Sequence, residues 1–129
     1  MKKKLILVVE DDPVVRELTK RQLKLLGFDS VAVGSGEEAV EKAQGGFALI
    51  FMDIGLPGIN GEHATLLIRE KELYQQRKRT PIVALTAHSD RERCKFAGMD
   101  DYLQKPALLQ DIRGILEKWV QPENGDNGC

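Results

Sequence analysis

The chain has 129 residues, of which 42% are hydrophobic and 30% are charged, and its formal net charge is −1. This length and this balance are typical of a single folded domain of a soluble protein. The small net charge and the lack of a long apolar run exclude a basic surface for nucleic acid, an attraction to anionic membranes and a membrane span.

Short apolar runs alternate along the chain with longer segments of helical periodicity. In chain order we expect a strand at residues 5–9, a helix from 13 to about 26, a strand at 29–33, a helix from 36 to about 44, a strand at 47–52, a helix from 61 to about 74, a strand at 82–85, a helix from 89 to about 98, a strand at 101–104 and a helix from about 107 onward. The last helix carries an apolar stripe made of Leu108, Ile112, Ile115, Leu116 and Trp119.

Capping residues support these helix boundaries. Asp12 as N-cap and Pro13 in the first turn begin the first helix, and Gly27 ends it. The segment Ser35-Gly36-Glu37-Glu38 is a capping box that begins the second helix. Asn60 caps the third helix.

Strands that alternate with helices predict a parallel sheet covered on both faces. The sequence contains no internal repeat and no sign of a second domain. We therefore expect one α/β domain over residues 1–120, followed by a disordered polar tail at 121–129.

Polar residues follow four of the expected strands. Glu10-Asp11-Asp12 follows the first strand, Asp53 the third, Thr86 the fourth and Lys105 the fifth. Sites in open α/β sheets form beyond the carboxyl ends of the strands, so these groups are expected to meet at one edge. Each feature alone is more often a helix cap or a surface residue, but their combination at successive strand ends is specific.

Crowded carboxylates repel one another unless a cation lies between them, and Mg²⁺ (or Mn²⁺) prefers a few carboxylates together with water and phosphate oxygens. A phosphoryl donor at such a site could transfer its phosphoryl group to Asp53 and form an aspartyl-phosphate. Lys105 would pair with one phosphoryl oxygen and Thr86 would donate a hydrogen bond to another.

Four segments carry a resemblance to a known family: LILVVEDDP, LIFMDIGLPGINGE, IVALTAH and AGMDDYLQKP. From about residue 4 to residue 120 the chain resembles the response-regulator receiver family. The resemblance implies a (βα)₅ flavodoxin-like, doubly wound sheet with five parallel strands in the order 2-1-3-4-5. It also implies phosphorylation of Asp53 and a cis peptide bond between Lys105 and Pro106.

The resemblance further assigns metal binding to Glu10, Asp11, Asp53 and the backbone carbonyl of Gly55. Many members of the family have Asp where this chain has Glu10, so the longer side chain is expected to reach the metal through water, with Asp11 as direct ligand. Asp12 is assigned to helix capping.

The resemblance implies a switch as well. In the family Thr86 moves toward the phosphoryl group, and the aromatic residue that matches Tyr102 turns inward. The face built by the fourth helix, the fifth strand and the last helix is where relatives often form phosphorylation-dependent homodimers.

Two functions remain open at this point. The first is a signalling receiver whose partner is a sensor histidine kinase or a histidine-phosphotransfer protein, with a resemblance to receivers of hybrid histidine kinases. The second is a phosphatase or phosphotransferase that forms an aspartyl-phosphate on a similar sheet. Haloacid-dehalogenase-like phosphatases have a second Asp two residues after the nucleophile, where this chain has Gly55, and this difference favours the receiver.

Other features have simpler interpretations. Gly34-Ser35-Gly36 lacks the Gly-Lys pair of a nucleotide loop. Cys94 and Cys129 form no CxxC pair, and the apolar run at 5–9 is too short for a signal peptide, so we expect reduced thiols and a cytoplasmic location. Trp119 is assigned to packing. The remaining candidates are assigned to the surface: His63, His88 and the run Arg77-Lys78-Arg79.

Overall fold

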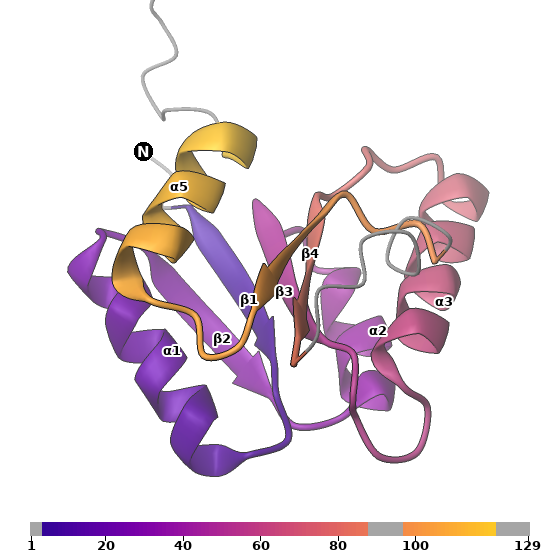
Figure 1. Ribbon diagram of the computed structural model, residues 1–129. Helices are drawn as coiled ribbons and strands as arrows, with labels where there is room; N and C mark the ends of the chain where they lie inside the picture. Colours follow the sequence, from indigo (N-terminus) through magenta and orange to yellow (C-terminus); the bar gives the residue numbers. More distant parts are fainter. Residues whose placement is uncertain (1–3, 88–96, 121–129) are drawn as a thin grey trace, which may run out of the picture.

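The computed structural model describes residues 4–87 and 97–120, which form one sheet with helices on both faces (Figure 1). The strands are β1 (Leu5–Val9), β2 (Asp29–Val33), β3 (Leu49–Asp53), β4 (Ile82–Thr86) and β5 (Asp101–Gln104). The helices are α1 (Pro13–Leu25), α2 (Gly36–Ala43), α3 (Gly61–Tyr74) and α5 (Leu109–Trp119). Most of the helix expected from residue 89, the dimer face that includes it, and the tail at 121–129 lie outside the described residues.

All strand pairs are parallel, and the order β2-β1-β3-β4-β5 is the one that the resemblance implied. The fold is therefore a doubly wound, flavodoxin-like sheet. The chain proceeds outward from β1 to β2 on one side and from β3 to β5 on the other, so the order reverses between β1 and β3. Ligands in such sheets bind at this reversal, beyond the carboxyl ends of the strands.

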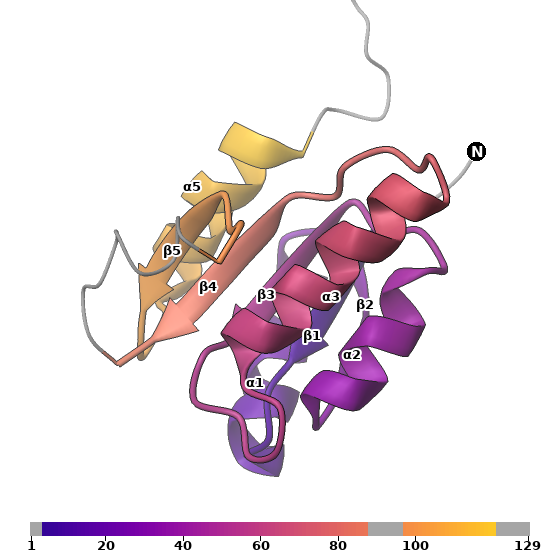
Figure 2. The same ribbon diagram turned by 90° about the vertical axis from the view of Figure 1, so that its right-hand side faces the viewer.

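Two apolar layers hold the helices against the sheet (Figure 2). On one face, Leu23 of α1 and Ile112 of α5 pack with alternate residues of the central strands, among them Phe51. On the other face, Ala39 of α2 and Ile68 of α3 pack with the intervening residues. The central strands β1, β3 and β4 are almost entirely buried, which explains why their sequences are continuous apolar runs.

The expected helix caps are confirmed. Asp12 Oδ1 accepts hydrogen bonds from Val14 N at 2.9 Å and from Val15 N at 3.4 Å. Ser35 Oγ accepts from Glu38 N at 3.2 Å, and Asn60 Oδ1 accepts from His63 N at 2.8 Å. Gly27, which follows the end of α1, has a φ of 91°, a conformation that favours glycine.

Two elements begin two residues later than predicted. The last helix begins at Leu109 and not at about residue 107, because the chain stays extended through Leu108, whose N–H donates to the Asp111 carboxylate at 3.2 Å. Leu108 is consequently 55% exposed and does not belong to the buried stripe. The third strand begins at Leu49 and not at residue 47, although Phe47 still packs against the core.

Candidate functional site

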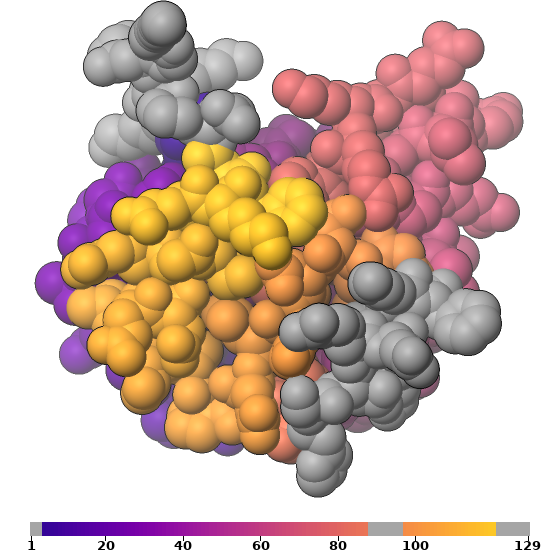
Figure 3. Space-filling model, turned by 45° about the horizontal axis from the view of Figure 1, so that its top comes forward, coloured from indigo at the N-terminus to yellow at the C-terminus, as the bar shows by residue number. Residues whose placement is uncertain are grey.

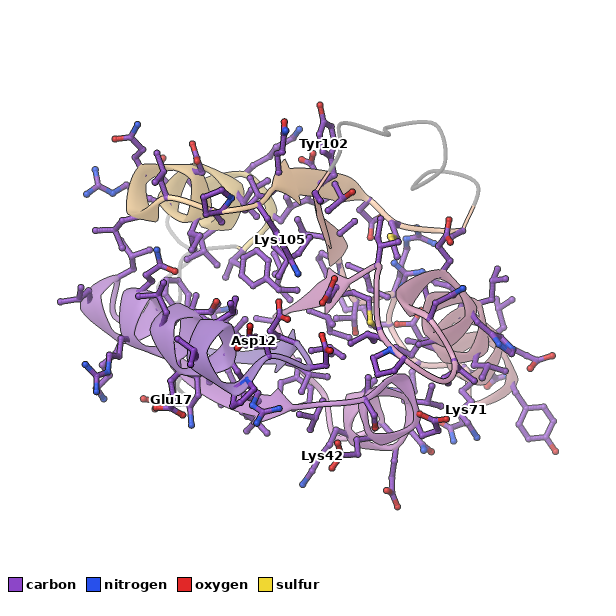
Figure 4. The ribbon with its side chains drawn as sticks, turned by 60° about the horizontal axis from the view of Figure 1, so that its bottom comes forward. Asp12, Glu17, Lys42, Lys71, Tyr102 and Lys105 are labelled. Carbon is purple, nitrogen blue, oxygen red and sulfur yellow. The ribbon has the colours of Figure 1, made fainter. Side chains whose placement is uncertain are left out.

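The expected site residues converge at the carboxyl ends of the strands, which Figure 4 views from outside. One carboxylate oxygen from each of Glu10, Asp11 and Asp53 lies within 4.8 Å of the others. Lys105 Nζ lies 3.0 Å from Glu10 Oε1 and 3.0 Å from Asp53 Oδ2. In Figure 4 Lys105 extends from the end of β5 toward the loop that carries Asp12. We call this set the carboxyl-edge cluster.

Asp53 is fixed by its backbone neighbours. It is the last residue of β3 and only 4% exposed, and its Oδ1 accepts a hydrogen bond from Gly55 N at 3.0 Å. Gly61, the first residue of α3, lies so close that a side chain there would collide with the Asp53 carbonyl oxygen. The start of α3 therefore lies against the end of β3. Because Gly55 N binds Oδ1, the other carboxylate oxygen, Oδ2, faces Lys105.

Glu10 is the most buried charge of the cluster, at 2% exposure. Its Oε2 accepts from Asp12 N at 3.2 Å. Its Oε1 has the ion pair with Lys105 but no hydrogen bond of good geometry within the described part of the chain. Burial raises the pKa of Glu10, opposed by Lys105 and Asp12 N and reinforced by repulsion from Asp53.

Lys105 compensates only part of this negative charge. Burial alone would lower the pKa of the Lys105 ammonium, but the carboxylates of Glu10 and Asp53 outweigh burial and raise it. The Lys105–Pro106 peptide bond is cis, as the resemblance implied. Three carboxylates around one ammonium leave a surplus of two negative charges.

This surplus fits a divalent cation. All the candidate ligands are oxygen atoms, which Mg²⁺ and Mn²⁺ accept, and the buried Glu10 Oε1 has only an imperfect partner. Asp11 is exposed and so can face a hydrated ion. Asp12 is the helix cap of α1, as expected.

The two residues of the expected switch occupy different surroundings. Thr86 ends β4 and is 7% exposed, and its carbonyl oxygen accepts from Lys105 N at 2.8 Å. Tyr102 lies on β5, half-buried against the core layer of α2 and α3. In Figure 4 the Tyr102 ring points away from Lys105.

No sequence pattern indicates two contacts that hold the loops of the site. Arg16 Nη1 on α1 donates to the Glu10 carbonyl oxygen at 3.1 Å. Gln22 Nε2, also on α1, donates to the Ala107 carbonyl oxygen at 3.1 Å. Both contacts fasten a site loop to α1, and both join side chains to backbone atoms that no pattern of residue types identifies.

The remaining candidates are mostly as expected. His63 is exposed, Ser35 acts as a cap, and Trp119 packs partly buried against the core. The assignment of the basic run to a solvated loop was incomplete, because Arg77 Nη1 donates to Ala43 O at 3.2 Å and Arg79 Nη2 lies 2.8 Å from an Asp100 oxygen. The other surface and thiol candidates fall outside the described residues: His88, Cys94 and Cys129.

Among the described helices, none has both the length and the apolar character that crossing a bilayer requires.

Comparison with known proteins gives consistent matches. The family profile described as "Response regulator receiver domain" matches residues 6–117. The chain is 38% identical over 124 residues to hybrid signal transduction histidine kinase F of Dictyostelium discoideum, covering 92% of this chain and 11% of that protein. The curated relatives are much longer proteins, and the chain spans between 7% and 14% of the lengths of those with the strongest matches.

Two of the matching solved structures resemble this chain over most of their own length. One is the receiver domain of a Pseudomonas aeruginosa sensor histidine kinase with a magnesium ion in its active-site cleft, 39% identical with a TM-score of 0.81, covering 92% of this chain and 98% of that one. The other is the receiver domain of Saccharomyces cerevisiae Ssk1, co-crystallised with the histidine phosphotransfer protein Ypd1. It is 29% identical with a TM-score of 0.86, covering 92% of this chain and 89% of that one.

Proposed function

Because the chain belongs to the response regulator receiver family of two-component signalling, we propose that Asp53 is its phosphoryl acceptor and that a phosphohistidine protein is its donor. The observation that carries this proposal is the convergence of Asp53, Lys105 and two further carboxylates at one strand edge. The domain is regulatory: its own phosphorylation and dephosphorylation are the reactions that it promotes, and no external substrate is turned over.

The transfer requires one bond to form as another breaks. A lone pair on Asp53 Oδ2 attacks the phosphorus atom, the P–N bond to the histidine ring breaks, and its electron pair returns to the ring nitrogen. Asp53 Oδ1 stays hydrogen-bonded to Gly55 N, which keeps Oδ2 directed toward Lys105. The Lys105 ammonium then pairs with a phosphoryl oxygen, and the Thr86 hydroxyl donates to another.

The proposed metal ligands are Asp11, Asp53 and the Gly55 carbonyl oxygen, with Glu10 as a contact through water. A bound Mg²⁺ or Mn²⁺ would neutralise charge on the carboxylates and on the phosphoryl oxygens. The burial of Glu10 and its imperfectly satisfied Oε1 support this assignment.

The response to phosphorylation is proposed to use Thr86 and Tyr102. Thr86 lies at the end of β4, one strand from Asp53, and a new phosphoryl oxygen would attract its hydroxyl. Ala84 of β4 pairs in register with Tyr102 of β5, so a movement at the end of β4 changes the space beside the tyrosine ring. The result is a shift between two populations of the same fold.

A donor protein must bring its phosphohistidine within bonding distance of the buried Asp53, so it must contact the rim of the site. The rim on the α1 side exposes apolar side chains, Val14 at 75% and Leu18 at 54%. Between α1 and the residues after β5 lies a hollow of about 310 Å³, and Lys105 forms part of its wall. We propose that an apolar helix face of a histidine-phosphotransfer protein or a sensor kinase docks on this side, which would place its histidine above Lys105.

Incubation with acetyl phosphate and Mg²⁺ tests the acceptor. One phosphoryl group per chain is expected, located on Asp53 by mass spectrometry, and both excess EDTA and Asp53→Asn should abolish it. Labelling of another residue would overturn the acceptor assignment. Sustained release of phosphate from unrelated phosphoesters would favour the alternative, a phosphatase or phosphotransferase.

The docking side is tested with Leu18→Glu, compared with Leu73→Glu on α3, where the side chain is 81% exposed. Leu18→Glu should slow labelling by a phosphohistidine protein at least about tenfold, equivalent to about 1.4 kcal/mol of lost binding, and leave labelling by acetyl phosphate unchanged. Leu73→Glu should change neither. Equal slowing by both variants would place the donor elsewhere.

A further inference from the structure

One carboxylate ties the edge strand of the sheet to the end of the last helix. Asp101 Oδ2 accepts hydrogen bonds from Trp119 Nε1 at 2.8 Å and from Lys118 Nζ at 3.0 Å. Asp101 Oδ1 accepts from Tyr102 N at 2.9 Å. Asp101 is the first residue of β5, and the other two side chains belong to the final turn of α5.

β5 connects this tie directly to the functional site. The strand ends at Gln104, and the next residue is Lys105, whose ammonium pairs with Glu10 and Asp53. Four residues of strand span about 13 Å, so both ends of a short extended segment are held by charged contacts.

β5 is also one of the two edge strands of the described sheet, and an edge strand shifts more easily than a central one. It lies at the edge of the described sheet with β4 as its one neighbour, and its residues are half-buried or exposed, whereas β3 and β4 are buried throughout. An edge strand loses fewer packing contacts than a central strand when it moves.

Phosphorylation of Asp53 changes the forces at one end of β5. It adds a phosphoryl group to a carboxylate oxygen, which brings more bulk and more negative charge, so the Lys105 ammonium must take a new position. A displacement at Lys105 passes along the extended backbone to Asp101, because a strand is much stiffer along its length than the contacts at its ends.

We propose that Asp101 is a positioning residue that couples the phosphorylation state of Asp53 to the C-terminal end of α5. This inference rests on the proposed function of Asp53. Tyr102 N shares the Asp101 carboxylate, so the proposed switch residue and Trp119 respond together.

The coupling reaches an accessible surface at the opposite end of the sheet. Trp119 and Val120 line a hollow of about 670 Å³, and the basic segment from Arg77 to Arg79 lines it as well. In Figure 3 the yellow end of α5 faces the salmon segment before β4 across this hollow. A movement of Trp119 therefore alters the shape of a surface that lies away from the phosphorylation site.

The tie persists at neutral pH. Burial of Asp101 would raise its pKa, but hydrogen bonds from Trp119, Tyr102 N and Lys118 outweigh burial and lower it. The Asp101 carboxylate is therefore ionised at neutral pH, so a change in the tie follows from phosphorylation of Asp53 and not from a change in pH.

Trp119 is the only tryptophan of the chain, so its fluorescence reports on this end of α5 alone. The full chain is treated with acetyl phosphate and Mg²⁺ while mass spectrometry follows labelling. We expect a shift of the emission maximum that tracks the labelled fraction. Asp101→Ala should be labelled at the wild-type rate but lose the shift, whereas Lys118→Met, which keeps the Trp119 bond, should retain it.

The outcomes separate the two proposals. Absence of labelling would overturn the function proposed for Asp53, whereas full labelling of the wild type without an emission shift would overturn the coupling alone. A wild-type shift in Asp101→Ala would remove Asp101 from the coupling. If that variant does not fold, NMR of the wild type decides: the Trp119 indole N–H and the Tyr102 amide resonances must both move on phosphorylation, and unmoved resonances contradict the coupling.

Discussion

Two groups of charged side chains, each containing buried carboxylates, lie at opposite ends of the same sheet, and they differ in how well their charges are matched. At the amino ends of β4 and β5, Arg69 donates to Glu72 and to Asp100 at 2.8 Å each, and Arg79 lies 2.8 Å from Asp100. Two carboxylates there meet two guanidinium groups, and we call this set the amino-edge network. In the carboxyl-edge cluster, three carboxylates lie close together, and Lys105 forms ion pairs with two of them, Glu10 and Asp53.

The polar atoms of the two groups are satisfied differently. In the amino-edge network, Glu72 Oε2 also accepts from Thr80 N at 2.9 Å and Asp100 Oδ2 accepts from Ile82 N at 2.9 Å. In the carboxyl-edge cluster, Glu10 Oε1 has only its ion pair with Lys105. Removing one partner of a matched buried pair is costly because the other charge is left unpaired, whereas a surplus of one sign shifts pKa values and favours the binding of an opposite charge.

The largest expected effect is at the amino edge. Asp100→Asn should lower the free energy of unfolding by about 3 kcal/mol, because it removes a largely buried charge that pairs with Arg69 and Arg79. Urea denaturation measures this loss. Lys24→Met, which removes an exposed pair with Asp29, should lower the free energy of unfolding by less than about 1 kcal/mol. Equal losses in the two variants would mean that the amino-edge network stabilises the fold no more than an exposed ion pair does.

The same type of substitution should act in the opposite direction at the carboxyl edge. Without divalent ions, Asp53→Asn should raise the free energy of unfolding by about 1 kcal/mol, because it relieves repulsion that contributes to the raised pKa of Glu10. The same denaturation experiment measures it. A loss of stability in this variant would contradict the idea of an uncompensated charge.

The smallest effect is a divergence of two titrations, again without divalent ions. Glu10 should titrate above the ordinary value of 4.5 and Asp101 below 3.8, which NMR of the side-chain carboxyl carbons can follow. Glu10, with a raised folded pKa, favours the folded state as pH falls through that pKa. Asp101, with a lowered folded pKa, contributes stability that is lost only as pH falls below 3.8 and through its folded pKa. Titration of both at their ordinary values would remove the electrostatic contrast.

The sequence was sufficient to predict the carboxyl-edge cluster. The rule that sites form beyond strand ends needs only the carboxyl ends of the strands, and the ends of β1, β3, β4 and β5 were predicted to within one residue. The limits of α3 and β5 were predicted correctly because Asn60 begins the helix and Asp101 follows a turn. Local signals were enough wherever an element carries its own boundary residues.

The amino-edge network and the Asp101 tie could not be predicted in this way. Arg69 meets Asp100 across 31 positions of the sequence, and Asp101 meets Trp119 across 18. Periodicity indicates which face of an element is buried, but not which polar side chains of two elements will meet. Leu108 was misplaced for a related reason, because its apolar character fits the stripe although the backbone there is not yet helical.

The most direct test of the charge surplus is the effect of Mg²⁺ on the stability of the wild type and of Asp11→Asn. Asp11 is exposed, so its substitution should leave the fold intact. The account predicts that Mg²⁺ raises the unfolding temperature of the wild type, and raises it further as the Mg²⁺ concentration increases, and that this rise is lost in Asp11→Asn. Equal stabilisation of both proteins, or of neither, would contradict it.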